Sequence, residues 1–310
     1  MHLSFFPAKK KLEINTEIRD DKTFYLCNGF SYEEIEIGHV RGLKVKAIKD
    51  SETDFSKEKF EKSINNMPVI SMNGCYEEID SLYFPDYDNS YKIIDADFAF
   101  KNCYNLRNIP KLPDTIETMN GSFIGCTTLL SHVFSLNLPK NLREANDCFA
   151  DCCFTRKIKK SYLPKNLKSA NRLFGTVHLG FVNGLLLNDN LKTFSCSLIL
   201  SDNHTILDII LNDNKVKIRK NVQRFFKVRK HDLNHLINVS VKEIKNSEIH
   251  CKEQNIYGTF SFNSSSDAVS FIRFIFNYYN RDERPIKGLE EFLNMLSGSI
   301  EDGDLNLLFD

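Results

Sequence analysis

A short segment recurs along this 310-residue chain every 23 to 26 residues, and in three of its five copies it contains a phenylalanine followed by a cysteine three residues later. The copies are DFAFKNCYNL from Asp97, NGSFIGCTTL from Asn120, NDCFADCCF from Asn146, NRLFGTVHL from Asn171 and a weaker SCSLILSDN from Ser195. A second pattern keeps step with the first: LPDTIETM from Leu112, LPKNLREA from Leu138, LPKNLKSA from Leu163, LNDNLKTF from Leu187 and LNDNKVKI from Leu211. Two patterns that share one period indicate an internal repeat.

Repeats of this length predict units that cannot bury their apolar side alone and therefore stack on one another. Phenylalanines at equivalent positions would then form one column, the phenylalanine column: Phe100, Phe123, Phe149 and Phe174. Cysteines would form a shorter row beside it: Cys103, Cys126 and Cys152. A third apolar layer is predicted from Ile116, Leu142, Leu167 and Leu191, each followed three residues later by Met119, Ala145, Ala170 or Phe194.

Polar and turn-forming residues also keep fixed places in the repeat. The proline of the LP pattern suits a corner, because it fixes φ and has no N–H to satisfy. An Asp or Asn follows the third apolar layer, in a set called here the asparagine ladder: Asp97, Asn120, Asn146 and Asn171. Such side chains bond to nearby backbone, so we expect each to cap the next turn.

The segment AFKNCYNLRNIPKLPDTI resembles the bacterial surface-antigen (BspA-like) class of leucine-rich repeats, which alternates AFxxCxxL and LPxxL/I halves. The resemblance implies an α/β repeat protein, a curved leucine-rich-repeat solenoid with short parallel strands. It also implies that the repeats bind another macromolecule. The pattern covers about residues 80–219 and departs from the family where Val177 stands in place of a cysteine and Leu198 in place of a phenylalanine.

The flanking segments predict three parts: a small N-terminal α/β cap at 1–79, about five to six repeats at 80–219, and a C-terminal α/β domain or cap at 220–310. Capping is expected because the end turns of a stack expose apolar surface. In the cap, TFYLCNGF and LKVKAIK favour strands and DFSKEKFEKSINNM favours a short helix. In the C-terminal part, INVSVKEI, SEIHCKE and IYGTFSFN favour strands, whereas SSSDAVSFIRFIFNYY and KGLEEFLNML favour helices.

Composition bears on the partners and the cellular location of the protein. The 41 Lys and Arg residues balance the 41 Asp and Glu residues, so no net field draws the chain toward nucleic acid or an anionic membrane. MHLSFFPAKKK lacks the apolar region of a signal peptide, and no segment has the ~18 apolar residues of a membrane span. Nine cysteines without an export signal predict reduced thiols. We expect a cytoplasmic protein, or one exported without a classical signal peptide.

Catalytic, cofactor and metal motifs are not found. The chain has no Gly-rich phosphate loop, GxSxG or HExxH pattern. Cys148, Cys152 and Cys153 lack the spacing of a zinc site, since Phe149 occupies the place of the first thiol of a CxxC pair. Two Cys/His pairs remain as candidates for nucleophilic chemistry: Cys27 with His39, and Cys251 with His250. Neighbouring strand residues face opposite ways, so His250 is a poor base for Cys251.

One basic stretch, KVKIRKNVQRFFKVRK at 215–230, has eight Lys or Arg residues and no acid. It indicates either an anionic partner or a basic linker helix at the end of the repeats, and the second interpretation is favoured. A second cluster, RKIKK at 156–160, could continue the same surface. The candidate binding residues are Arg143, Lys157, Lys159, Lys160, Lys168, Arg219, Lys220 and Arg224.

The function favoured by these features is a non-enzymatic protein-interaction module, a scaffold or a bacterial effector, that binds its partner through the repeat surface. One alternative is an enzyme with its active site in residues 220–310, whose substrate the repeats select. A third is binding to nucleic acid or an anionic surface through residues 215–230. We predict a protein partner, at most weak binding to nucleic acid, and no cofactor or metal.

Overall fold

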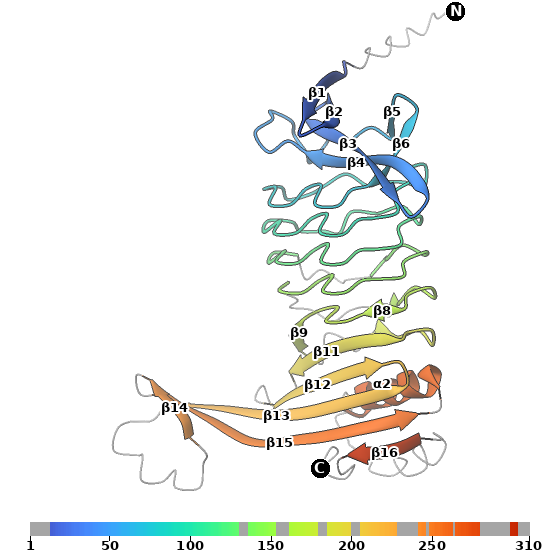
Figure 1. The fold of residues 1–310 in the computed structure, drawn as a ribbon. Coiled ribbons are helices and arrows are strands. Elements are labelled where there is room, and N and C mark those ends of the chain that lie inside the picture. The colour runs from blue at the N-terminus through green and yellow to red at the C-terminus, as the bar shows by residue number, and fades with distance from the viewer. Residues whose placement is uncertain are drawn as a thin grey trace, which may run out of the picture.

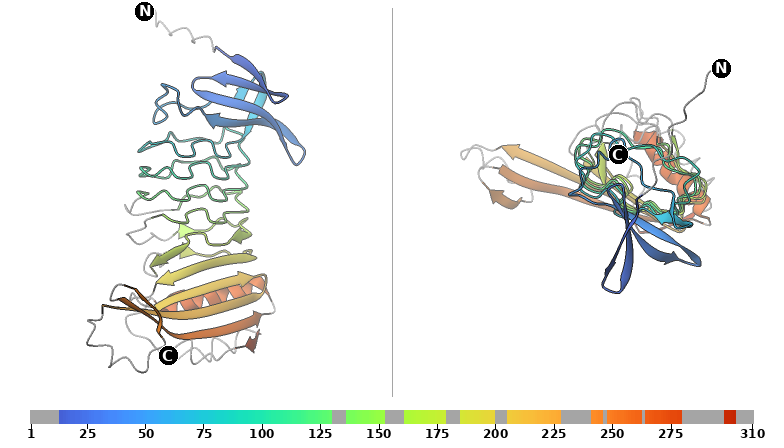
Figure 2. Two further views of the ribbon diagram at one scale, coloured as in Figure 1. Left: turned by 60° about the vertical axis from the view of Figure 1, so that its left-hand side comes forward. Right: turned by 90° about the horizontal axis from the view of Figure 1, so that it is seen from above.

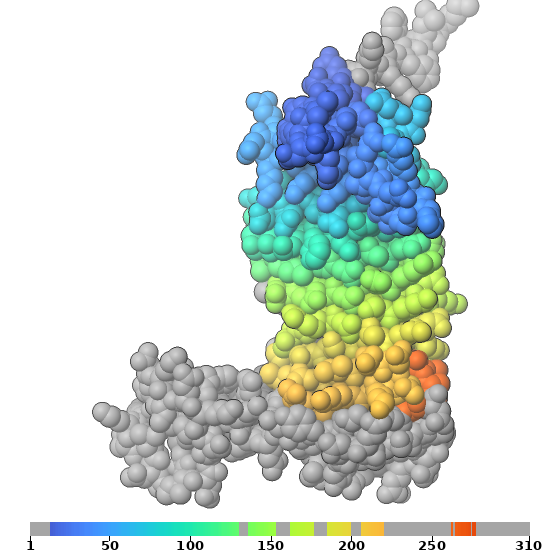
Figure 3. All heavy atoms as spheres, in the orientation of Figure 1, coloured from blue at the N-terminus to red at the C-terminus, as the bar shows by residue number. Residues whose placement is uncertain are grey.

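The computed structural model describes residues 13–129, 136–152, 161–178, 185–199, 205–227, 241–245, 248–262, 264–279 and 298–302. These residues form two mixed β-sheets with a stack of irregular turns between them (Figure 1). The stacked turns are formed by the described residues 71–129, 136–152 and 161–175. In the space-filling view, successive segments of the chain follow one another as continuous bands, so each turn packs directly on the next (Figure 3).

The N-terminal sheet has six strands in the order β1-β2-β3-β4-β6-β5, in which only β4 and β6 run parallel. The strands are β1 (Asn15–Arg19), β2 (Lys22–Cys27), β3 (Phe30–Ile37), β4 (Val40–Ala47), β5 (Ser63–Ile64) and β6 (Met67–Ser71). The Phe30 ring packs edge-on against Phe60 and Tyr76, with centroids 5.9 and 6.0 Å away. Tyr76 belongs to the first stacked turn, so the sheet and the stack share one core.

Backbone hydrogen bonds join each stacked turn to the next. Isolated parallel bridges connect Ser71, Asp95, Thr118, Glu144 and Ser169 in that order. Further along each turn, the N–H groups of Phe100, Phe123 and Phe149 each donate to a carbonyl of the following turn over 2.8 Å. The turns are therefore held by evenly repeated bonds, although most of their residues belong to no strand.

Two residues with left-handed backbone recur in every turn. The pairs are Gly74 and Glu78, Phe98 and Asn102, Gly121 and Gly125, Asp147 and Asp151, and Arg172 and Gly175, with φ between 49° and 71°. The two members lie four residues apart in the first four turns and three apart in the last. Such residues reverse the chain within a few positions, so the segment that carries the phenylalanine column has no room for a helix.

The C-terminal sheet has eight strands, and the path β14-β15-β13-β12-β11-β8 is extended by β16 beside β15 and β9 beside β11. The strands are β8 (Ser169–Ala170), β9 (Thr176–His178), β11 (Thr193–Ile199), β12 (Thr205–Asn212), β13 (Lys215–Lys227), β14 (Val241–Lys245), β15 (Glu248–Phe262) and β16 (Gly298–Asp302). A separate parallel pair consists of β7 (Ser161–Tyr162) and β10 (Leu185–Leu186). β13 and β15 run beyond the stack at one side, where β14 pairs with β15 (Figures 1 and 2).

Helix α2 (Ser265–Tyr279) packs on the buried face of this sheet. The Ser264 hydroxyl oxygen accepts the Asp267 N–H over 3.1 Å and caps the helix start. Phe276 lies 6.4 Å from Phe194 of β11, centroid to centroid, and Arg273 bonds to the Leu187 carbonyl oxygen. α2 thus connects the sheet to the last turns. No helix among the described residues is long and apolar enough to cross a membrane.

The predicted fold class is wrong. The described residues are mostly β, with α2 as their single helix, and they do not form an α/β leucine-rich-repeat solenoid. Two further predictions fail for related reasons. Residues 54–62 form turns and irregular backbone instead of a helix, and residues 215–227 form β13 instead of a linker helix. In β13, alternate residues Val216 and Ile218 are buried while Lys215, Lys217 and Arg219 are exposed, which is a strand period.

Other expected elements have different outcomes. The predicted strands near residues 237–262 correspond to β14 and β15 where the structure describes them, and the predicted helix at 264–279 is α2. The predicted helix at 287–296 lies outside the described residues. β13 continues across residue 219, where the sequence placed the end of the repeats.

Candidate functional site

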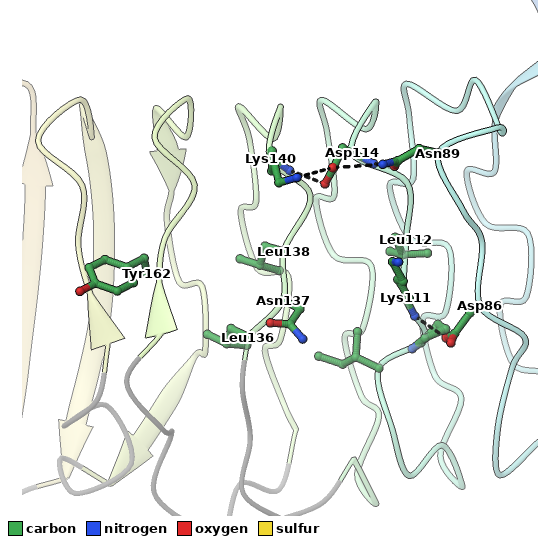
Figure 4. Close-up of a pocket in the computed structure, with 12 residues that line it drawn as sticks. Asp86, Asn89, Lys111, Leu112, Asp114, Leu136, Asn137, Leu138, Lys140 and Tyr162 are labelled. Atoms are coloured by element: carbon green, nitrogen blue, oxygen red, sulfur yellow. Dashed lines mark hydrogen bonds and ion pairs between the residues drawn. The ribbon is translucent and has the colours of Figure 1, made fainter.

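An open cavity of about 710 Å³ lies beside the LP motifs of the stacked turns (Figure 4). It is called here the corner groove. One row of its lining residues comes from equivalent positions of four successive turns: Asp86, Lys111, Asn137 and Tyr162. A second row comes from three of these turns: Asn89, Asp114 and Lys140. Leu112 and Leu138 of the LP motifs lie between the two rows in the close-up view (Figure 4).

Hydrogen bonds between turns fix the first two members of the first row. The Lys111 N–H donates to Asp86 Oδ1 over 2.7 Å, and the Tyr87 N–H donates to the Lys111 carbonyl over 2.8 Å. Both bonds join residues about one repeat apart, so the two turns are held in register. The prolines at the LP corners leave no N–H group without a partner, because proline has no backbone N–H.

The second row is a continuous polar chain. The Asp114 N–H donates to Asn89 Oδ1 over 2.7 Å, and Asn89 Nδ2 donates to Asp114 Oδ2 over 3.3 Å. Lys140 Nζ lies 3.0 Å from Asp114 Oδ2 (Figure 4). The bond from Lys140 lowers the pKa of Asp114 below its usual range. The carboxylate of this row is therefore ionised at neutral pH and already has a partner.

Apolar side chains form the rest of the groove. Leu112 and Leu136 are buried, and Leu138 is partly buried. Tyr162 lies at one end of the groove with 67% of its surface exposed. A large aromatic ring held beside leucines is the kind of surface that an apolar side chain of a partner can cover.

The phenylalanine column forms in the described structure. The rings of Phe100, Phe123, Phe149 and Phe174 stack nearly parallel, with centroids 5.0, 5.3 and 5.8 Å apart in sequence. Tyr76 extends the column by one turn, 5.4 Å from Phe100. All of these rings are buried, so the column belongs to the core and supports the groove from inside.

The cysteine row lies beside the column. The thiols of Cys103, Cys126 and Cys152 donate to the carbonyl oxygens of Tyr76, Phe100 and Phe123 over 3.0, 3.1 and 3.0 Å. Burial raises the pKa of the Cys103 and Cys126 thiols well above the usual value. Within the described ranges, no group of His, Cys, Asp and Glu side chains could hold a metal ion.

The asparagine ladder bonds between turns. The backbone N–H of Asn120 donates to Asp97 Oδ1 over 2.7 Å, that of Asn146 to Asn120 Oδ1 over 2.9 Å, and that of Asn171 to Asn146 Oδ1 over 2.9 Å. The side chains of Asp97, Asn120 and Asn146 thus each accept the backbone N–H of the equivalent residue one turn later.

Among the described basic residues singled out in the sequence, Arg143, Lys168 and Arg219 do not line the corner groove. Arg143 and Lys168 lie on successive turns, joined by a 2.8 Å bond from the Lys168 N–H to the Arg143 carbonyl, and Arg143 pairs with Glu117 at 3.3 Å. Arg219, Lys220 and Arg224 follow one another along β13. Lys157, Lys159 and Lys160 lie outside the described residues.

The two Cys/His candidates are not supported by the placement of their residues. Cys27 pairs with Phe30 at the start of β3, whereas His39 follows Ile37 at its other end. The strand between them is roughly 23 Å long at ~3.3 Å per residue. His250 and Cys251 are adjacent on β15.

The residues of the corner groove were not found from the sequence. A signal was present, because the position before each LP or equivalent corner leucine is Lys111, Asn137 and Tyr162 in successive repeats. Side chains that change type at one fixed position of a repeat are candidates for a binding surface, while the invariant positions build the core.

The protein is mostly β, and its stack of turns has a mixed sheet at each end. The stack carries an open cavity along its corners. In comparisons with known proteins, no family model, no curated protein and no solved structure matches this chain.

Proposed function

We propose that this protein is a non-enzymatic binding module that holds an extended segment of a protein partner in the corner groove. The observation that carries the proposal is the cavity of about 710 Å³ lined by equivalent positions of four successive turns. A surface built by repetition offers the same geometry at regular intervals, which suits a ligand that is itself a repeating chain.

The dimensions favour a short extended peptide segment. Hydrogen-bonded neighbouring chains lie ~4.8 Å apart, so four turns span roughly 14 Å. An extended polypeptide covers ~3.4 Å per residue, so about four residues would fill the groove along the stack. Because the cavity is open, the rest of the partner can continue beyond it.

The charges favour a segment without net charge. The described carboxylates of the groove, Asp86 and Asp114, are balanced by Lys111 and Lys140, and Asp114 is already paired with Lys140. An anionic ligand at Lys140 would have to displace the bond that this lysine makes with Asp114. The exposed ring of Tyr162 and the LP leucines instead offer contact to aliphatic or aromatic side chains.

The rigidity of the stack supports binding. The phenylalanine column and the asparagine ladder fix each turn against the next, so the groove needs little ordering when a ligand enters. Preformed sites lose less conformational entropy on binding than flexible ones.

A peptide-display library of unstructured ten-residue sequences, selected on the immobilised full-length protein, tests this function. We expect enrichment of uncharged sequences with large apolar residues. Tyr162→Ala should weaken the selected peptides at least tenfold, because it removes the most exposed apolar side chain of the groove. The matched control is Tyr104→Ala, since Tyr104 is 55% exposed but does not line the groove.

Salt provides the second readout. Binding through apolar contact should change less than about threefold between 50 and 500 mM salt, whereas phosphate or acidic ligands held by many cations lose affinity steeply. Selected peptides that are acidic and salt-sensitive, or that bind the Tyr162→Ala variant as tightly as the parent, would contradict the proposal.

A further inference from the structure

A second cavity, of about 290 Å³, lies on the outer face of the C-terminal sheet, where β11, β12 and β13 meet the last stacked turn. It is called here the basic pocket. Its cationic lining residues are Arg172, Lys217 and Arg219, its hydroxyls are Ser195 and Ser197, and its one carboxylate is Asp208. None of these residues lines the corner groove, so the two sites are separate.

Strand register explains why these residues meet. Ser195 lies opposite Ile210, which lies opposite Lys217. The next outward-facing row consists of Ser197, Asp208 and Arg219. Arg172 joins from the stack, where its N–H donates to the Ser195 hydroxyl oxygen over 2.9 Å. Three cationic side chains from two distant parts of the chain therefore surround one apolar residue, Ile210.

Hydrogen-bond donors exceed acceptors in the basic pocket. The Asp208 carboxylate accepts the Ser197 hydroxyl over 2.6 Å, and Arg172 Nε pairs with Asp147 at 3.1 Å. The two terminal nitrogens of the Arg172 guanidinium carry further donors. Lys217 Nζ makes no ion pair with any described residue, and the Ser195 hydroxyl hydrogen finds no acceptor among them.

We propose that the basic pocket binds an oxyanion, a phosphate or a carboxylate, on a ligand whose apolar part covers Ile210. Guanidinium, ammonium and hydroxyl donors around one concavity are the groups that bind oxyanions in proteins. Ile210 is 44% exposed, a large aliphatic side chain at the centre of a charged site, and it provides a surface for the rest of the ligand. The proposal is independent of the corner groove.

Titration of the full-length protein with inorganic phosphate, phenyl phosphate and succinate, each at constant ionic strength set with chloride, tests the site by calorimetry. We expect saturable binding that Lys217→Gln and Arg219→Gln each weaken at least fivefold. Lys192→Gln is the matched control, because Lys192 is an exposed lysine just before β11 that does not line the pocket. If inorganic phosphate binds more tightly than succinate, the ligand is a phosphate. If succinate binds more tightly, the ligand is a carboxylate.

The apolar part of the proposal has its own readout. Phenyl phosphate should bind at least threefold more tightly than inorganic phosphate, and Ile210→Ser should remove that gain without abolishing phosphate binding. The proposal is overturned if none of the three anions binds saturably, or if Lys192→Gln weakens binding as much as Lys217→Gln. The latter result would show a diffuse surface charge instead of a site.

Discussion

The ring of Phe98 lies directly over Gly121 of the next turn: a Cβ on Gly121 would come within 2.5 Å of Phe98 Cε1. The two residues occupy equivalent positions of successive turns, and both have left-handed backbone, with φ of 54° and 61°. Phenylalanine is strained in that conformation, whereas glycine is not. The Phe98 ring is also 39% exposed, so the strain is not offset by full burial.

This relationship predicts a coupled pair of substitutions. Gly121→Ala should destabilise the protein by about 1 to 3 kcal/mol, because the new methyl group meets the Phe98 ring and the left-handed backbone disfavours a side chain. Phe98→Gly should be nearly neutral, since relief of strain opposes the loss of a partly exposed ring. Chemical denaturation of both single variants and the double variant measures the coupling.

Gly121→Ala should therefore destabilise the Phe98→Gly variant less than it destabilises the parent protein. If Gly121→Ala destabilises the parent and the Phe98→Gly background equally, the ring does not limit the space at Gly121.

The phenylalanine column predicts a large loss of stability at its centre. Phe149→Ala should cost about 3 to 5 kcal/mol, because it leaves a cavity between the stacked rings of Phe123 and Phe174. Arg143→Ala and Lys168→Ala should stay within about 0.5 kcal/mol, since both side chains are exposed. Urea unfolding compares the stabilities of these variants. Equal losses from the core and surface substitutions would show that the phenylalanine column contributes no more to stability than exposed residues do.

The asparagine ladder predicts that Asp97→Asn stabilises the fold by an amount that depends on pH. Burial raises the pKa of Asp97 above its usual value, so its ionisation opposes folding. Its contribution is most favourable below the usual aspartate pKa of about 4 and is lost as the pH rises through the raised value. Asparagine keeps the acceptor for the Asn120 N–H without the charge. The stability gain of the variant should therefore grow between pH 3 and pH 7.

Asp114 is the control with the opposite sign. Its pKa is lowered by the bond from Lys140, so its contribution is present above the usual aspartate pKa and is lost as the pH falls through the lowered value. Asp114→Asn should be less stable than the parent at pH 7 and match it in acid. Thermal melts across the pH range distinguish the two, and parallel pH profiles for both variants would contradict the assignment of opposite shifts.

The cysteines predict slow chemistry in the folded state. Burial is described for seven of the nine cysteines, and all seven are buried and form no disulfide bond. Burial raises the pKa of Cys148 well above the usual value, which keeps its thiol protonated and unreactive. A thiol reagent should therefore label at most two cysteines quickly in the native protein and all nine in denaturant. Rapid labelling of three or more native thiols would be inconsistent with this packing.

Much of the core could be predicted from the spacing of residues along the sequence. The 23- to 26-residue period selects the phenylalanines that stack, the cysteines beside them and the polar ladder, because residues that contact only their neighbours in a stack must recur at equivalent positions. The apolar helical face at 264–279 likewise coincides with α2. These features depend on local pattern and on burial, which the sequence expresses directly.

Fold class and sites depend on contacts that the period does not express. The expected α/β class came from a resemblance in motif, whereas the left-handed pairs such as Phe98 and Asn102 reverse the chain without a helix. A phenylalanine gives no sequence signal of left-handed backbone. Arg172 and Lys217 meet only because β11 pairs with both the stack and β12. Cross-strand register of this kind cannot be read from spacing along one chain.

The position of α2 has a consequence for synthesis on the ribosome. A stacked turn can acquire its neighbour after about one further repeat has emerged, since its bonds join residues such as Asn120 and Asn146. The buried residues of β12 and β13 must wait longer for the helix whose Phe271 and Phe276 share their core. The turns can therefore assemble in order from the N-terminus, while the core of the last sheet stays incomplete until residues 264–279 have left the exit tunnel.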